Sequence, residues 1–299
     1  MATPRSLIDA VLRSVCGCGI DRLVPLSGGG MNETYRVELG GDVSVIARIA
    51  RQPEPWFLDE AHLMARARQV GVPTPEVLGL EQLQHEGALL SFSIQRFLPG
   101  RTLADMVGEL SAEELERLVV EAGELLARVH SVVPDGNRGI RHELRVPAAD
   151  IVDRVVGIVA PALGTAAAQV VERGAAFLRH EIATRAASPT ALAQGDFMPK
   201  NLLVHGGVIV GVLDWEFAGP APPAFDLARW EVSTGDPLQD RSDLVRRGYA
   251  RLTDPAQAAA GLIPAFAVDW ALEQLAWRNP APPAQVRRCV DVIARYAGP

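Results

Sequence analysis

The stretch QGDFMPKN (Gln194–Asn201) is followed by the apolar run Leu202–Val204 and then by GVLDW (Gly211–Trp215). It places an Asp, an Asn five residues later and a second Asp thirteen residues further on, each on a turn beside a short apolar strand. Phosphoryl transfer needs one carboxylate to accept a hydroxyl proton, and an amide and a second carboxylate to hold magnesium on a nucleotide triphosphate. The segment therefore indicates transfer of a phosphoryl group to a hydroxyl.

Each of these three side chains has a predicted role and an ordinary structural alternative. Asp196 is the predicted catalytic base, although Gly-Asp pairs are also common in plain turns. Asn201 and Asp214 are the predicted magnesium ligands, since magnesium takes few protein oxygens and leaves its other positions to water and phosphate. The alternative for both is a turn residue next to a strand. Asp214 directly follows an apolar strand, where a carboxylate is costly unless a cation or hydrogen-bond donors meet it.

Composition limits the class of protein. With 299 residues, 48% of them apolar and 22% charged, the chain is long enough for two lobes with separate cores. Its longest apolar runs are too short to cross a bilayer, and the amphipathic segment at residues 7–15 indicates a surface helix and not a signal peptide. The three cysteines show no metal-ligand spacing, and no basic stripe indicates nucleic acid. We therefore expect a cytoplasmic protein with no nucleic-acid or membrane partner.

The first hundred residues have the pattern of a strand-rich lobe. Glycines and an Asp at residues 40–42 indicate a hairpin turn between two alternating strands, and Pro73-Thr74-Pro75 ends a predicted helix. The predicted elements are a five-stranded antiparallel sheet from residues 23–26, 34–39, 43–49, 77–80 and 89–95, with helices over 7–15 and 57–70.

Helical patterns dominate the rest of the chain. Ser111 and Glu114 form a capping-box signature that begins a helix ending near His130, whose ring is expected to interact with the helix dipole. We predict lobes at residues 1–98 and 99–299 with a cleft between them. The expected helices cover residues 111–130, 147–160, 164–186, 224–232, 238–252, 256–278 and 282–297.

Three ordered motifs make the chain resemble the aminoglycoside phosphotransferase family, over residues 23 to about 230. The catalytic-loop pattern stands here as Gln194–Asn201, the metal-binding turn as Leu213-Asp214-Trp215-Glu216, and a downstream element as Pro223–Ala228. The resemblance implies an α+β, bilobal protein-kinase-like fold. It also implies a phosphotransferase that uses ATP, with GTP possible, and Mg²⁺, and that acts on a small-molecule hydroxyl.

The resemblance also assigns nucleotide-binding residues in the first lobe. The turn before the second strand would cover the nucleotide, Arg48 would contact the α- and β-phosphates, and Glu60 would partner Arg48. A flexible hairpin, an outward strand charge and a solvated helix face are the respective alternatives. The backbone of the segment joining the lobes would bind the adenine edge. The assigned residues are Ser27, Gly28, Gly29, Gly30, Asn32, Arg48, Glu60, Gln95, Phe97 and Leu98.

Three residues in or near the predicted catalytic loop have roles that the motif alone does not define. The family has His where this chain has Gln194, and an amide can also donate and accept hydrogen bonds. Lys200 either faces the transferred phosphoryl group or is a solvent-exposed loop charge, and the second reading is favoured. Asp226 is expected to be structural, accepting backbone N–H groups of the catalytic loop or capping the helix that begins there.

The phosphate acceptor is less defined. Trp270, Glu273 and Trp277 share a helix face and form either a ligand-binding wall or ordinary packing. We expect an antibiotic acceptor, with two alternatives: a metabolic small-molecule kinase, or a nucleotide-binding module without transfer activity. A monomer and a homodimer both fit the sequence. The candidate substrate residues are Asp153, Trp230, Glu231, Trp270 and Glu273.

Overall fold

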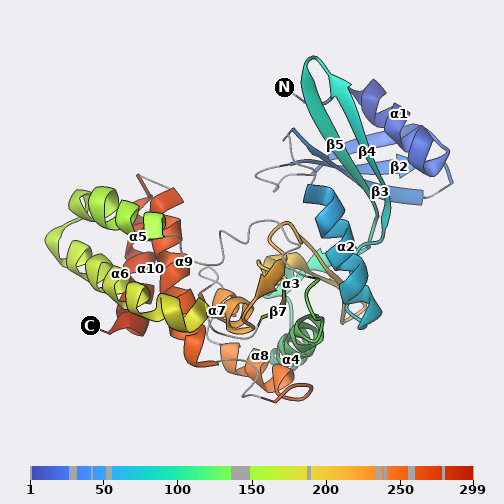
Figure 1. Cartoon of the computed structure of the whole chain (residues 1–299). Helices are drawn as coiled ribbons and strands as arrows, with labels where there is room; N and C mark the ends of the chain where they lie inside the picture. Colours follow the sequence, from blue (N-terminus) through green and yellow to red (C-terminus); the bar gives the residue numbers. More distant parts are fainter. Residues whose placement is uncertain are drawn as a thin grey trace.

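The computed structural model describes residues 2–26, 32–41, 43–51, 56–135, 149–186, 190–232, 238, 241–254, 260–277 and 280–298, without the side chains of 149–151, 182–186 and 277. Figure 1 shows a sheet at one end of the molecule and helices over most of the remainder. The predicted α+β bilobal fold is confirmed. The predicted glycine turn Ser27–Gly30 and the Trp277 side chain lie outside the description.

The N-terminal sheet is antiparallel throughout and has five strands in the order β1-β2-β3-β5-β4. Alternate residues of β3 are buried, as expected for a strand with one covered face. The amphipathic helix α1 packs Ile8 and Leu12 into the sheet's core. The elements are α1 (Arg5–Cys16), β1 (Ile20–Pro25), β2 (Glu33–Leu39), β3 (Val43–Ala50), β4 (Val77–His85) and β5 (Ala88–Arg96).

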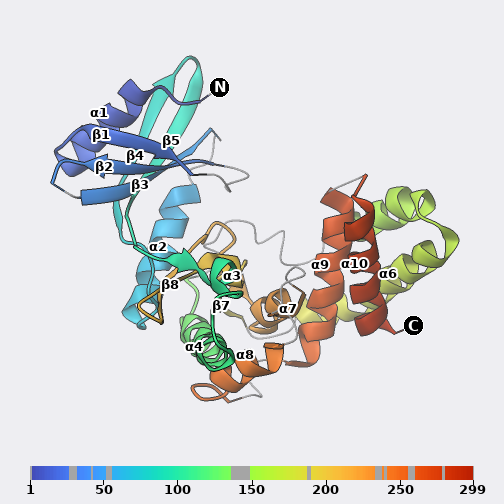
Figure 2. The ribbon, with the colours of Figure 1, turned by 180° about the vertical axis from the view of Figure 1, so that it is seen from behind.

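Helix α2 (Trp56–Gln69) links the sheet to the central part of the molecule (Figure 2). Its buried residues Leu63, Met64 and Ala67 belong to the same core as the long helix α4 (Ala112–His130). One turn earlier, Glu60 is buried and pairs with Arg48 of β3. The contacts of α2 with the central core therefore fix the position of Glu60, whose side chain faces the sheet.

The central part carries the catalytic-loop segment between short strands. Helix α4 begins with the predicted capping box, formed by Ser111 and Glu114, and packs against α8 (Ser242–Tyr249). The other elements are β6 (Arg101–Thr102), α3 (Leu103–Met106), β7 (Ala191–Ala193), a 3₁₀ turn (Pro199–Asn201), β8 (Leu202–His205), β9 (Val208–Val212), β10 (Gly219–Ala221) and α7 (Ala224–Val232).

A helical group with its own core lies at the end opposite the sheet (Figures 1 and 2). It consists of α5 (Ala149–Arg154), a π turn (Val155–Val159), a 3₁₀ turn (Ala160–Ala162), α6 (Thr165–Ala186), α9 (Ile263–Trp277) and α10 (Pro283–Ala297). Another 3₁₀ turn (Ala260–Leu262) precedes α9. Among the described residues, no helix combines the length and apolar character needed to span a membrane.

Most predicted elements are present, with corrected ends. The helix predicted over 147–160 is α-helical only at Ala149–Arg154 in its described part, and continues as the π and 3₁₀ turns. The helix predicted over 238–252 is limited to Ser242–Tyr249, and the strand predicted over 77–80 extends to His85. Strands β6, β7 and β10 were not predicted, because two or three residues carry no readable alternation.

Candidate active site

The predicted catalytic loop begins in a glycine turn, and a side chain of the second lobe holds the backbone N–H groups of this turn. Gly195 has φ +93°, and a Cβ there would lie 2.2 Å from the carbonyl oxygen of Phe217, so no side chain fits without displacement. Asp226, in the first turn of α7, accepts the N–H groups of Gln194 at 2.7 Å and of Gly195 at 2.8 Å. The prediction that Asp226 binds the backbone of the catalytic loop is confirmed.

The Asp196 carboxylate is oriented by its neighbours on the same loop. Asn201 donates from Nδ2 to the Asp196 carbonyl at 2.9 Å and to its Oδ2 at 3.0 Å. Lys200 places Nζ 3.0 Å from the same Oδ2, although its own side chain is 57% exposed. Lys200 is thus solvent-exposed, as favoured, and is also paired with Asp196. These contacts fix one carboxylate oxygen and so define the direction of the group.

Asp214 sits on the turn that follows β9, in a left-handed conformation with φ +59°. Burial raises the pKa of its carboxyl group, and the nearby Arg48 guanidinium opposes that rise. The turn is tied to the catalytic loop, since Leu213 donates its N–H to the carbonyl of Asn201 at 2.8 Å. A partly buried carboxylate and the Asn201 amide therefore come from two turns that are hydrogen-bonded to each other.

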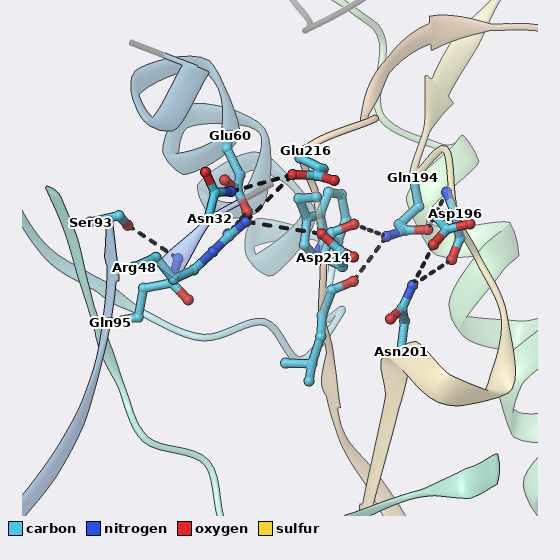
Figure 3. Close-up of polar contacts among 12 residues, drawn as sticks. Asn32, Arg48, Glu60, Ser93, Gln95, Gln194, Asp196, Asn201, Asp214 and Glu216 are labelled. Atoms are coloured by element: carbon cyan, nitrogen blue, oxygen red, sulfur yellow. Dashed lines mark hydrogen bonds and ion pairs between the residues drawn. The ribbon is translucent and has the colours of Figure 1, made fainter. Parts of the chain in front are cut away.

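Gln194 joins the same two turns through its side chain. Its Nε2 donates to the carbonyls of Leu213 at 2.9 Å and Asp214 at 2.6 Å, while its Oε1 accepts the N–H of Asp196 at 2.9 Å. The residue is fully buried. An amide supplies both a donor and an acceptor, so Gln194 connects the turn of the predicted base to the turn of the predicted metal ligand (Figure 3).

A cluster from the first lobe faces these turns (Figure 3). Arg48 pairs with Glu60 and places Nη2 4.0 Å from carboxylate oxygens of both Asp214 and Glu216. Its side chain is 12% exposed, and interaction with Glu60 raises its pKa against the effect of burial. Asn32 donates to Glu216 at 3.4 Å. Sequence reasoning missed Glu216 as a site residue, although it stands two residues after Asp214 in the quoted motif.

The predicted adenine-edge segment lies at the end of β5 and just beyond it. Gln95 is buried and donates from Nε2 to the Ser93 hydroxyl at 3.2 Å. The Arg36 guanidinium lies over the ring of Phe97, with its Cζ 4.3 Å from the ring centroid. The side chain of Leu98 lies close to Gly211 of β9. These side chains are used in packing, so the predicted role would fall to the main chain, and that of Gln95 already pairs within the sheet with Ile46 and Val77.

The predicted substrate residues fall into separate places. Trp270 and Glu273, together with Asp269, line a small pocket between α7 and α9, which Arg229 and two Phe side chains complete. Trp230, by contrast, is 1% exposed and packs against Phe197 in the central core. A side chain that is buried in this way does not present a surface to a ligand.

The other two predicted substrate residues take part in ion pairs. Glu231 pairs with Arg246 of α8 and accepts the Tyr296 hydroxyl of α10 at 2.7 Å. Asp153 is exposed and pairs with Arg179 of α6 at 2.6 Å. Of the five predicted residues, the structure therefore brings together only Trp270 and Glu273.

The sheet, the helical second lobe and the acid–amide–acid arrangement on adjoining turns define a phosphotransferase of kinase-like fold. The sequence model of the phosphotransferase enzyme family (APH) matches residues 22–276. The chain belongs to this family and is an enzyme that transfers phosphoryl groups, as the motifs predicted.

Solved structures support the fold. The aminoglycoside phosphotransferase APH(4)-Ia, as the apo form of a thermostable mutant, is 18% identical with a TM-score of 0.69, covering 97% of this chain and 100% of that one. The gentamicin complex of APH(2")-IIa is 15% identical with a TM-score of 0.66, covering 99% and 97%. A putative fructosamine-3-kinase from Thermobifida fusca YX-ER1 is 18% identical with a TM-score of 0.64, covering 97% and 98%. No curated protein matches the sequence.

The Gln194 bridge gives a testable prediction. Gln194→Leu removes three hydrogen bonds to buried groups of the two turns. Each buried group left unpaired destabilises this arrangement of the turns by about 1–3 kcal/mol. We therefore expect kcat to fall about tenfold or more. Gln194→His, which keeps one donor and one acceptor, is expected to retain more activity than Gln194→Leu. Steady-state turnover with saturating nucleotide measures both, and equal kcat in wild type and Gln194→Leu would exclude a connecting role.

Proposed function

We propose that the protein is an ATP-dependent O-phosphotransferase that moves the γ-phosphoryl group to a hydroxyl of a small molecule. The observation that carries this proposal is that Asn201 is hydrogen-bonded to Asp196 and that their loop is tied to the turn of Asp214. The ties are the Leu213–Asn201 backbone hydrogen bond and the Gln194 side chain. A base for the hydroxyl and oxygen ligands for a divalent cation are the groups such a reaction requires. Residues 1–98 would form the nucleotide-binding lobe, and residues 99–299 would carry the catalytic loop and the substrate site.

Asp196 is the proposed base. One hydrogen bond from Asn201 and the charge of Lys200 hold one carboxylate oxygen in place. A carboxylate held in this way accepts the proton as the acceptor oxygen attacks phosphorus, and aligns that oxygen with the leaving group. Lys200 is close enough to lower the energy of negative charge that develops nearby.

Asn201 and Asp214 are the proposed magnesium ligands, and the donor set fits such an ion. Asn201 uses its Nδ2 on Asp196, so its carbonyl oxygen is the atom that would reach a cation. Burial makes the charged form of Asp214 costly, and a cation would offset that cost. Bound with the nucleotide, Mg²⁺ would neutralise charge on the phosphate oxygens.

Arg48 and Glu60 are proposed to serve the nucleotide. Arg48 stays charged in any environment and can bind two phosphate oxygens at once. Its contacts with Glu60, Asp214 and Glu216 hold the guanidinium at the edge of the predicted metal site. Asn32 and the turn Ser27–Gly30 would cover the phosphates. The main chain around Gln95, Phe97 and Leu98 would bind the adenine of ATP, or the guanine of GTP.

The acceptor is proposed to be an antibiotic, and within this class an aminoglycoside. Asp269 and Glu273 place two carboxylates at the small pocket between α7 and α9, where Arg229 offsets one of the two charges. The guanidinium of Arg288 lies over the Trp270 ring, 4.9 Å from the ring centroid, so this part of the second lobe already binds a cation against an aromatic face. The solved complex of APH(2")-IIa with gentamicin supports an aminoglycoside as the class of acceptor. The resemblance to a putative fructosamine-3-kinase favours, as the second candidate, a metabolic kinase with the same chemistry.

A panel of hydroxyl compounds tests this proposal. Purified protein, ATP and Mg²⁺ are incubated with aminoglycosides, other antibiotics and amino sugars, and each compound is checked by mass spectrometry for the gain of one phosphoryl group. Phosphorylated aminoglycosides, together with resistance of cells that express the gene, support the antibiotic kinase. Transfer only to metabolites supports the second candidate, and transfer to none of the compounds favours a nucleotide-binding module.

Replacing Asp214 tests the proposed metal site. Asp214→Ala is expected to weaken nucleotide binding about tenfold or more when Mg²⁺ is present, and to change it little when Mg²⁺ is absent, because the carboxylate acts through the ion. Isothermal titration calorimetry with a non-hydrolysable ATP analogue gives both values. Asp291→Ala, on the exposed side of α10, is the matched control. Unchanged affinity in Mg²⁺ would contradict the role of Asp214.

A further inference from the structure

Behind the catalytic loop, a buried histidine contacts the aspartate that holds the loop. His130, the last residue of α4, places Nε2 3.1 Å from Oδ2 of Asp226. The side chains of His130 and Asp226 are 2% and 0% exposed. The same carboxylate binds the N–H groups of Gln194 and Gly195. The His130 ring thus has a bonding role that its position at a helix end did not predict.

The other nitrogen of His130 contacts a buried tyrosine. Nδ1 lies 2.9 Å from the hydroxyl oxygen of Tyr249, the last residue of α8. Burial, and secondarily the charge of Asp226, raises the pKa of Tyr249, so its phenol keeps the proton that it can donate. The Asp226 carboxylate accepts two backbone N–H groups, and its contact with Nε2 assigns the ring proton to Nε2 and leaves Nδ1 to accept from the Tyr249 hydroxyl. This gives a directed chain from Tyr249 through His130 to Asp226.

A close backbone contact determines where Tyr249 lies. A Cβ at Gly248 would fall 2.0 Å from the Val120 carbonyl oxygen, and a Cβ at Gly123 2.1 Å from that of Val245. Helices α4 and α8 therefore meet backbone to backbone at these two glycines. Gly248 directly precedes Tyr249, so the contact brings the tyrosine hydroxyl within reach of the end of α4.

We propose that Tyr249 and His130 are positioning residues for phosphoryl transfer. They touch neither the nucleotide nor the acceptor, and they act by fixing the orientation of Asp226. Both oxygens of Asp226 must point at consecutive N–H groups of the loop, and a rotation of the carboxylate would release Gln194 and Gly195. Asp196 follows directly, so its direction depends on the same contacts. The proposed consequence for turnover rests on Asp196 being the base.

Removing one hydroxyl tests this chain. Tyr249→Phe deletes the donor to His130. Tyr296→Phe deletes a partly buried hydroxyl bonded to Glu231 in the same lobe, away from the loop, and is the matched control. Amide hydrogen exchange of residues 194–201 is measured by mass spectrometry. Turnover is measured as ADP release from ATP, with water and the aminoglycoside panel as acceptors. In Tyr249→Phe, the backbone amides of this segment are expected to exchange at least tenfold faster than in wild type. The kcat of the variant is expected to fall about tenfold, and its KM for ATP to stay within about twofold of wild type.

A second pair of variants addresses the ring. His130→Gln keeps a donor and an acceptor and is expected to retain slow exchange and most of kcat, whereas His130→Leu loses both. Tyr249→Phe matching Tyr296→Phe in either exchange or kcat would overturn the proposal, as would equal behaviour of His130→Gln and His130→Leu. Wild-type protein without any turnover would count against the proposed function instead, and the exchange comparison would then decide alone whether the pair holds the loop.

Discussion

Replacing Asp196 with Ala is expected to lower kcat by about 10²–10⁴-fold, which is the usual contribution of general base catalysis. Nucleotide affinity is expected to change by less than about threefold, because Asn201, Asp214 and Arg48 remain in place. Loss of the carboxylate also removes the partner of Lys200, whose Nζ lies 3.0 Å from Asp196. Because the Lys200 side chain is 57% exposed, its unpaired charge stays in water and should not weaken the fold. The effect therefore belongs to the chemical step and not to binding.

Rapid-mixing measurements of phosphoryl transfer, with calorimetry for nucleotide affinity, separate these two contributions. Asp291→Ala, a surface carboxylate of α10, is the control for loss of one negative charge. A variant at Asp196 that keeps more than about a tenth of wild-type kcat would remove the base from this position. Loss of nucleotide binding in parallel with kcat would assign Asp196 to the binding site instead.

The second large effect is expected at Gly195. An Ala there must adopt a left-handed conformation with φ +93°, and its Cβ would meet the Phe217 carbonyl oxygen at 2.2 Å. Backbone strain and forced displacement together are expected to destabilise the protein by about 2–5 kcal/mol. Because Phe217 follows the turn of Asp214, the displacement also separates the two turns, and kcat should fall with stability.

Gly108→Ala is the matched control, since a Cβ at Gly108 meets nothing within 4 Å and no left-handed φ is required. Chemical denaturation gives the free energy of unfolding of both variants, and turnover is measured well below their transitions. A Gly195→Ala protein as stable and as active as Gly108→Ala would show that the two turns do not pack against each other by their backbones.

The fold was predictable where the pattern was long and local. The capping box at Ser111 and the apolar spacing of residues 7–15 each indicated a helix that the structure contains. The three-residue strands β7 and β10 pair Ala193 with Gly219, across a distance in sequence that no local pattern encodes. Their pairing depends on tertiary packing, which single-sequence reasoning does not see.

The site was predictable from motif spacing and less so from residue type. Asp226 was expected either to accept backbone N–H groups of the catalytic loop or to cap the helix that begins there, and it takes the first of these roles. Trp230 was expected at the acceptor, yet it is buried in the core. The prediction failed because the sequence does not show which neighbouring element covers an aromatic side chain on a helix. The contact of His130 with Tyr249 joins distant segments and had no signal in the sequence. Glu216 stands in the quoted motif, but its contact with Arg48 joins the two lobes, which motif spacing does not show.

A crystal structure with a non-hydrolysable ATP analogue and Mg²⁺ would show whether Asn201 and Asp214 form a metal site on the nucleotide. We expect the ion between the phosphates and the oxygens of Asn201 and Asp214, with Arg48 on the phosphates and Asp196 facing the terminal phosphate. An ion bound without either Asn201 or Asp214, or a triphosphate whose terminal group lies away from Asp196, would contradict this expectation.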